Sequence, residues 1–118
     1  MVTKTHLTNN SQSVMKTQEF NENNLVDYLF VASKEHLYSE MQVEGVILSL
    51  TNGKYYGVNE VGATIWSAIQ APASFNKIQT AVMDNYYVDS ETCRLQILEF
   101  LQVMFKEDLI EILHEKAV

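Results

Sequence analysis

The chain has 118 residues, the length of one domain, and it is 47% hydrophobic and 19% charged, which allows a packed core and excludes global disorder. Fifteen acidic residues against eight basic ones give a net charge of −7, which argues against a nucleic-acid binder. One cysteine excludes an internal disulfide and a multi-thiolate metal site, and short apolar runs exclude a transmembrane helix. With no secretion or import leader visible, we expect a soluble cytoplasmic protein with no membrane partner.

The first 24 residues differ in composition from the rest of the chain. They contain few sizeable apolar side chains and are rich in Asn, Gln, Ser and Thr. Such a stretch cannot bury enough surface to offset its ordering entropy. Residues 1–24 are therefore predicted to be a mobile tail, and residues 25–118 to be the functional domain.

Three strands are predicted next, after an apolar extended arm at residues 29–32. Residues 37–41 alternate between apolar and polar side chains, which indicates a half-buried strand. Residues 46–50 have the strongest strand pattern of the chain. Asn52-Gly53 follows and favours a two-residue type I′ turn, so residues 54–58 are expected to return antiparallel. The result is a three-stranded meander.

The second half of the chain is predicted to be helical. Asn59 is placed to cap a helix that begins at Glu60, whose negative charge suits a helix start. Pro72 ends that segment, and Ser74 can cap a second helix with apolar residues at helical spacing. The fold class is therefore α+β, a three-stranded antiparallel sheet followed by a three-helix bundle.

The third helix is expected to start at Asp89 or Ser90 and to run to about Glu107. The acidic pair Glu107-Asp108 is expected to be solvent-exposed. Residues 109–113 are expected to form either a short strand or a last helical turn. Apolar side chains cover well over half of the circumference of the third helix, more than a surface helix needs. This helix therefore either lies between two layers, which composition favours, or offers an apolar strip to a partner.

The third strand is exposed along one side unless another segment covers it. Lys54 is its one charged residue and Tyr55 and Tyr56 are its aromatic ones, so the edge is weakly protected. A short strand of this kind can be a harmless edge. It can also accept an extended peptide as a further strand.

Catalytic and metal sites find little support. The histidines share no metal-ligand spacing and are expected to be solvated, with His6 in the tail, His36 in a loop and His114 near the end. Cys93 lies in the first turn of a helix, where the dipole can lower a thiol pKa, but a small buried residue is the better expectation. We therefore predict no enzyme, no metal and no cofactor.

Two other functions remain open from the residues alone. Three helices with a hairpin-like ending suit a winged-helix DNA-binding protein, but the third helix carries only Arg94 and Lys106 as basic residues among several glutamates. An apolar helix face also suits a structural subunit of a homodimer. Salt-dependent DNA binding and the mass in solution would separate these alternatives.

Several stretches resemble the PqqD-like family. Residues 53–63 (GKYYGVNEVGA), followed by Ile65-Trp66, look like its signature, and the match continues through residues 87–92, 98–101 and 109–110. The family includes pyrroloquinoline quinone biosynthesis protein D and the leader-binding proteins of lasso-peptide pathways, and Trp66 looks closer to the lasso type. The resemblance covers about residues 36–113.

This resemblance implies a recognition element for ribosomally made precursor peptides, with a winged-helix-like bundle. In the family, the leader of the precursor pairs antiparallel with the third strand and lies in a cleft beside the third helix. Carried onto this chain, the implied peptide-binding residues are Lys54, Tyr55, Tyr56, Gly57, Val58, Arg94, Ile97, Leu98, Leu101 and Phe105.

The implied function is a non-catalytic adaptor that presents the precursor peptide to a partner enzyme. That partner would be a leader peptidase and then a cyclase in a lasso pathway, or a radical S-adenosylmethionine enzyme in the quinone pathway. Lys54 or Arg94 could meet an acidic residue of the leader. The chain departs from the family at Asp108, where many members have a glycine in a left-handed helix cap.

Overall fold

A computed structural model of the chain describes residues 2–4, 20–41 and 44–114. Within them no helix is long and apolar enough to cross a membrane. The predicted tail lies partly outside the described residues. The elements, in chain order, are β1 (Val2–Lys4), the single-turn helix η1 (Leu25–Asp27), β2 (Tyr28–Ala32), β3 (His36–Met41), β4 (Glu44–Ser49), β5 (Tyr55–Val58), α2 (Glu60–Ala68), β6 (Ala73–Ser74), α3 (Phe75–Asn85), α4 (Ser90–Lys106) and β7 (Ile110–His114).

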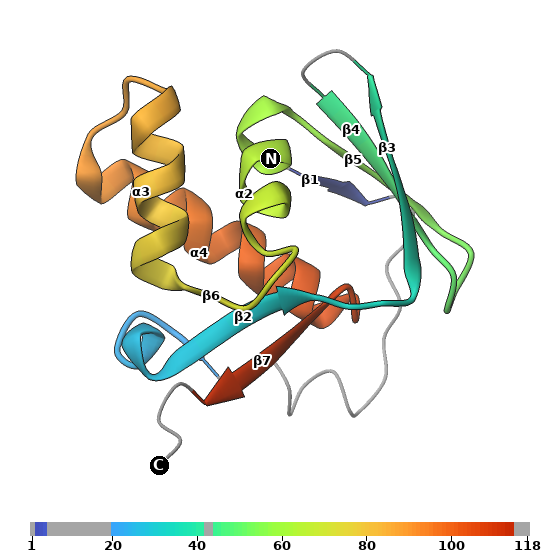
Figure 1. Cartoon of the computed structure of the whole chain (residues 1–118), viewed down its shortest axis with the longest axis horizontal. Coiled ribbons are helices and arrows are strands. Elements are labelled where there is room, and N and C mark those ends of the chain that lie inside the picture. The colour runs from blue at the N-terminus through green and yellow to red at the C-terminus, as the bar shows by residue number, and fades with distance from the viewer. Residues whose placement is uncertain (1, 5–19, 42–43, 115–118) are drawn as a thin grey trace.

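The strands form two antiparallel sheets rather than one (Figure 1). The predicted meander is present as β3, β4 and β5, and β1 adds a fourth strand beside β5. The second sheet has the order β6-β2-β7. Helix α2 packs against the meander at β4 and β5, whereas α3 and α4 pack against the second sheet. Residues 29–32 thus belong to a central strand, not an arm, and residues 110–114 form a strand, not a helical turn.

The β4–β5 connection differs from the predicted type I′ turn. That turn needs positive φ at both central residues, but Gly53 has φ 73° while Asn52 does not lie in that region. Instead, the N–H of Ser49 donates to the carbonyl of Lys54 at 2.9 Å and closes a longer loop. The Asn52 side chain stabilises this loop by accepting from the N–H of Lys54 at 2.8 Å.

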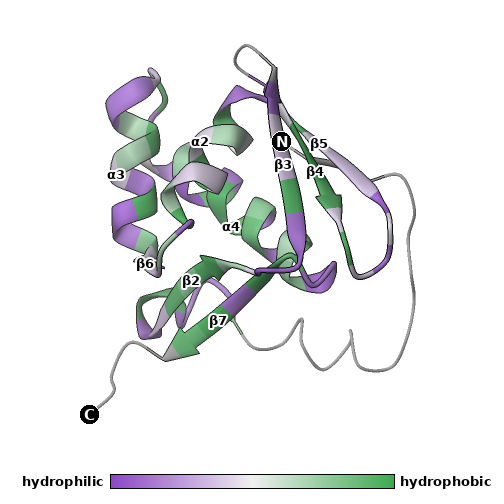
Figure 2. Ribbon diagram, turned by 45° about the vertical axis from the view of Figure 1, so that its right-hand side comes forward, coloured by the Kyte–Doolittle hydropathy of each residue, from purple (hydrophilic) through white to green (hydrophobic). Residues whose placement is uncertain are grey.

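The helices begin where the capping residues predict. The side chains of Asn59, Ser74 and Asp89 each accept a hydrogen bond from a backbone N–H in the first turn of their helix. Hydrophobic and hydrophilic residues alternate along α3, as expected for a helix with one buried face (Figure 2). The helices therefore supply a core into which both sheets pack.

Helix α4 is covered on more than one side, which is the alternative that its composition favoured. It contacts both α3 and β7, and Leu95 is its one large apolar residue that is markedly exposed, at 43%. Its buried residues are Cys93, Ile97, Leu98, Phe100, Leu101, Met104 and Phe105. The apolar excess of this helix therefore belongs mainly to the core.

Helix α4 ends in a left-handed cap at Asp108, whose φ is 63°. The N–H of Leu109 donates to the carbonyl of Met104 at 2.9 Å, and the N–H of Asp108 donates to the carbonyl of Phe105 at 3.1 Å. These two bonds are the Schellman pattern, in which glycine is the usual left-handed residue. The acidic residue at this position thus carries the conformational cost that glycine avoids.

Glycine at position 108 is expected to stabilise the protein relative to alanine. Asp108→Gly and Asp108→Ala both remove the carboxylate, but only alanine keeps the β-carbon that disfavours positive φ. We expect the glycine variant to be more stable by about 1 kcal/mol in urea denaturation. Equal stability of the two variants would contradict a strained cap.

Candidate functional site

The β5 strand has one edge bound to β4 and another that faces away from it. Because Ser49 and Lys54 are hydrogen-bonded across the β4–β5 hairpin, every second residue from Lys54 directs its main chain toward β4. That set includes Tyr56 and Val58. The main-chain N–H and C=O groups of Tyr55 and Gly57 therefore point to the opposite edge.

This outer edge accepts a strand from the same chain. β1 runs antiparallel to β5 with Thr3 opposite Gly57, Val2 opposite Val58 and Lys4 opposite Tyr56 (Figure 1). The alternation just described makes Thr3 and Gly57 the hydrogen-bonded pair. The edge is thus open to β-pairing from outside the meander.

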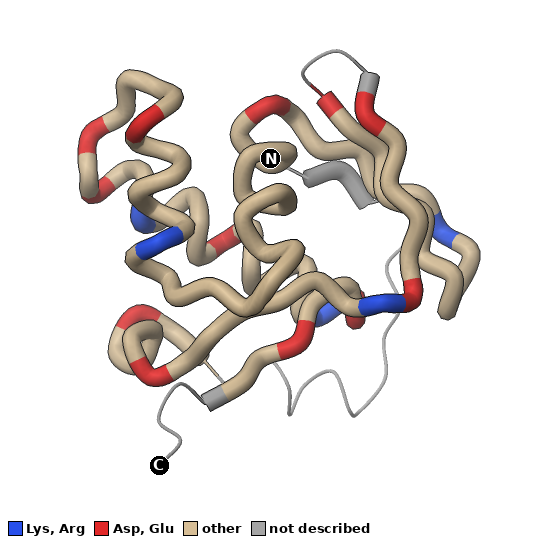
Figure 3. Tube along the Cα trace, viewed as in Figure 1, with Lys and Arg blue, Asp and Glu red and all other residues tan. Residues whose placement is uncertain are grey.

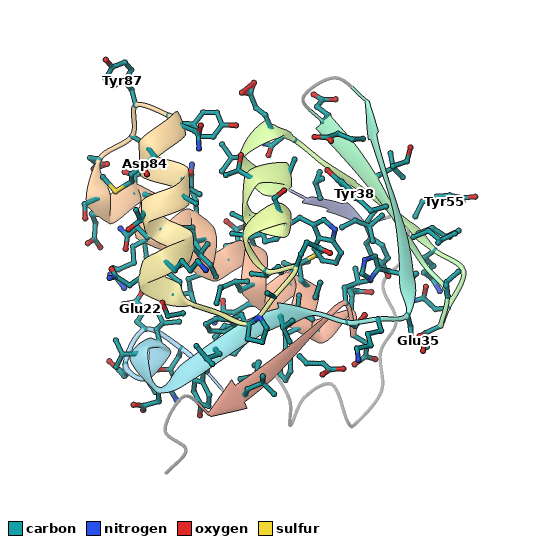
Figure 4. The ribbon with its side chains drawn as sticks, in the orientation of Figure 1. Glu22, Glu35, Tyr38, Tyr55, Asp84 and Tyr87 are labelled. Carbon is teal, nitrogen blue, oxygen red and sulfur yellow. The ribbon has the colours of Figure 1, made fainter. Side chains whose placement is uncertain are left out.

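The side chains of β5 alternate between the core and the outer face of the sheet. Tyr56 and Val58 are buried, whereas Tyr55 is 56% exposed and points away from the helices (Figure 4). Lys54, just before the strand, is partly exposed. A β-carbon added at Gly57 would meet no atom within 4 Å, so this position has room for a side chain.

A buried hydrogen bond fixes β5 against the end of α4. The hydroxyl of Tyr56 donates to Oε1 of Glu107 at 2.9 Å, and the Asn52 side chain donates to the same hydroxyl at 3.2 Å. Glu107 is 5% exposed, so the expectation of a solvated acidic pair at residues 107 and 108 was wrong for this residue. Sequence reasoning missed it because the partner that justifies its burial lies far away in the chain.

Loss of the Tyr56 hydroxyl is expected to destabilise the protein. Tyr56→Phe leaves the buried Glu107 without this donor, which should lower the free energy of unfolding by about 1–3 kcal/mol in urea denaturation. The matched change at exposed Tyr55, Tyr55→Phe, should have little effect. Equal stabilities of the two variants would contradict the structural role of the hydrogen bond.

The same tyrosine gives an expected pH dependence. Burial raises the pKa of Tyr56, and the nearby Glu107 carboxylate raises it further, although the Asn52 hydrogen bond acts in the opposite direction. The neutral tyrosine therefore contributes stability below its ordinary pKa of 10.0, and this contribution is lost as the pH rises above it. The loss of folding stability at alkaline pH should therefore be smaller in Tyr56→Phe, which has no hydroxyl to ionise at this position.

The predicted site residues of α4 are mostly buried. Leu101 and Ile97 are fully buried, Leu98 is 6% exposed and Phe105 is 9% exposed. Phe105 is covered in part by Phe20, with ring centroids 5.7 Å apart. These four residues therefore belong to the core in this structure and do not line an open surface.

Arg94 is the predicted helix residue that reaches the surface. Its guanidinium lies 3.0 Å from a carboxylate oxygen of Glu91 and 3.9 Å from one of Glu22. It also helps to line a surface hollow between η1 and the start of α3, together with Leu25, Phe75 and others. An acidic residue of the chain itself thus occupies the position at which an acidic ligand was expected.

Nucleophilic and metal chemistry gain no support from the described residues. Cys93 is fully buried. Burial raises the pKa of its thiol, and the charge of Asp89 raises it further, so the thiolate is disfavoured. His36 is the first residue of β3, not a loop residue, and its ring packs edge-on against Trp66 at 4.9 Å. The described part of the chain has no group of three or more His, Cys, Asp and Glu placed to hold a metal ion.

The charges also fail to form a nucleic-acid surface among the described residues. Lys and Arg are scattered over separate elements and do not gather along α4 (Figure 3). The geometry offers instead the outer edge of β5, which pairs with β1 of the same chain.

A solved structure with a similar fold includes a bound peptide. The structure matches that of TbiB1 in complex with the TbiA(beta) leader peptide, with a TM-score of 0.64, 27% sequence identity and coverage of 75% of this chain and 99% of TbiB1. No curated protein matches the chain at a significant level. The likeness therefore rests on a protein whose structure includes a bound leader peptide.

The family model described as coenzyme PQQ synthesis protein D, PqqD, matches residues 44–110. The match runs from the start of β4 to the start of β7, which is more than half of the 118 residues, and it includes β5 and the whole of α4. With its meander, its three helices and this match together, the chain belongs to the PqqD family.

Proposed function

We propose that the protein is a non-catalytic adaptor that binds the leader segment of a ribosomally synthesised precursor peptide as a strand added to β5. The observation that carries this proposal is the outer edge of β5, which pairs with a strand that is not part of the meander. Main-chain pairing of this kind supplies affinity without any catalytic group. The leader peptide bound to TbiB1 supports the same class of ligand.

The contacts to the leader are proposed to fall into two groups. The main chains of Tyr55 and Gly57 would hydrogen-bond the leader, and the exposed side chain of Tyr55 would pack against alternate leader residues. Lys54 would attract acidic leader residues, and Arg94 would do so in exchange for its own pairs with Glu91 and Glu22. The buried residues of α4 would hold β5 in position, in line with the Tyr56–Glu107 hydrogen bond.

The adaptor is proposed to act in the cytoplasm by raising the local concentration of precursor at a partner enzyme. A leader peptidase, a cyclase or a radical S-adenosylmethionine enzyme would fit this role. The protein itself would contribute binding and orientation. This division of labour requires one surface for the leader and another for the enzyme.

The proposal is tested by capture on the immobilised full chain from lysate of the source cell, with mass spectrometry of bound peptides. A recovered precursor peptide is then synthesised as its leader segment and titrated against the protein. Saturable binding supports the adaptor. Recovery of nothing but further copies of the chain would favour a structural homodimer, and salt-dependent binding of duplex DNA would favour a winged-helix regulator.

A further inference from the structure

The strand β1, which covers the outer edge of β5, is held there by few contacts. β1 has only three residues, Val2–Lys4, and it pairs with β5 on one side alone because it is the edge of its sheet. Its hydrogen-bonded pair with β5 is the Thr3–Gly57 pair. A contact this small is easily exchanged for a longer strand.

The chain is anchored again at Phe20. This ring is 1% exposed and packs edge-on against Phe30 at 5.3 Å and Phe105 at 5.7 Å. Next to it, the N–H of Asn21 donates to the Asn24 side chain at 2.7 Å and closes a local turn. Phe20 therefore belongs to the core, and residues 5–19 connect this anchor to β1.

Resting on the proposed function, we propose that residues Val2–Lys4 are a built-in competitor of the leader for the outer edge of β5. An edge strand can pair with only one further strand, so β1 has to leave before a leader can pair with Gly57. The covalent connection through residues 5–19 gives β1 a high effective concentration at this edge. The leader can displace β1 because it pairs with β5 over a longer stretch and makes further contacts outside the strand.

The size of the effect follows from the fraction of molecules with a free edge. The apparent dissociation constant equals the intrinsic constant divided by that fraction. If β1 covers the edge in about 70–90% of molecules, its removal should tighten leader binding about three- to tenfold. Covering the edge between binding events would also block unwanted pairing with other chains.

The test compares Thr3→Pro with Thr3→Ala in the full-length chain. Both variants lose the threonine side chain, but only proline removes the N–H that pairs with Gly57. Two readouts are measured, the exchange rate of the Gly57 amide by NMR and the affinity for a fluorescein-labelled TbiA(beta) leader peptide and for the captured leader. We expect faster Gly57 exchange and about three- to tenfold tighter leader binding in Thr3→Pro.

Other results would overturn the inference in distinguishable ways. Equal Gly57 exchange in the two variants would show that β1 does not protect the edge. Faster exchange with unchanged leader affinity would show that β1 covers the edge without competing. If neither leader binds any variant, the proposed function fails and competition fails with it, while the Gly57 exchange rate still reports whether β1 covers the edge.

Discussion

Proline at Gly57 is expected to lower leader affinity by about 30-fold or more. The N–H of Gly57 faces the outer edge, so proline removes a donor to the leader and leaves a leader carbonyl without its partner. A lost partner of this kind costs about 2 kcal/mol or more, which corresponds to roughly 30-fold in affinity. The bonds between β5 and β4 do not use this N–H and should survive.

The matched control is Gly57→Ala, which keeps the N–H and has room for its β-carbon. Both variants are compared in the Thr3→Pro background, because β1 pairs through the same N–H and its loss would otherwise offset part of the effect. Anisotropy titrations with the labelled leader give the two affinities. Equal affinities in two folded variants would contradict strand addition at β5.

The structure also shows why position 57 is a better probe than its neighbour. Tyr56 is the intuitive target on the sequence, because it lies at the centre of the expected edge strand. Its main chain, however, faces β4, and its side chain is fully buried. Proline there would break the sheet, so a loss of binding would say nothing about the edge.

Aspartate at Leu101 is expected to abolish folding. Leu101 is fully buried in α4, so the change removes about 2–5 kcal/mol of packing and buries an unpaired charge in addition. That sum approaches or exceeds the whole stability of a typical domain, about 5–15 kcal/mol. Loss of the cooperative urea transition in far-UV circular dichroism would show it.

The control on the same helix is Leu95→Asp, because Leu95 is 43% exposed. This variant should keep the transition and shift it only slightly. A folded Leu101→Asp protein that had lost only leader affinity would contradict the core role and restore Leu101 as a contact residue.

Local signals made much of the fold predictable from the sequence. The capping side chains Asn59, Ser74 and Asp89 act within three residues of themselves, so the helix starts could be read directly. The alternation in residues 37–41 likewise reports one local period, and it predicted β3. The turn at Gly53 shows the limit of such local signals. The Asn-Gly pair predicted a two-residue turn, but it lies in a longer loop in which only Gly53 of the pair has a positive φ.

Long-range pairing was not predictable in the same way. β1 lies in a polar stretch and is defined only by its partner β5, more than fifty residues away. The burial of Glu107 depends on Tyr56, again across the molecule. Helical periodicity placed Leu101 on an apolar arc, but it could not separate a face buried by the chain itself from one offered to a ligand.

The central claim, a leader added as a strand to β5, is tested most directly by isotope-filtered NMR on the complex of the isotope-labelled protein with the unlabelled leader. Facing residues that are not hydrogen-bonded bring their Hα atoms together in an antiparallel pair, and on this edge those residues are Tyr56 and Val58. We predict Hα–Hα contacts from the leader to both, in place of the contacts from Lys4 and Val2. Leader contacts elsewhere, with the pairing of β1 unchanged, would contradict the account.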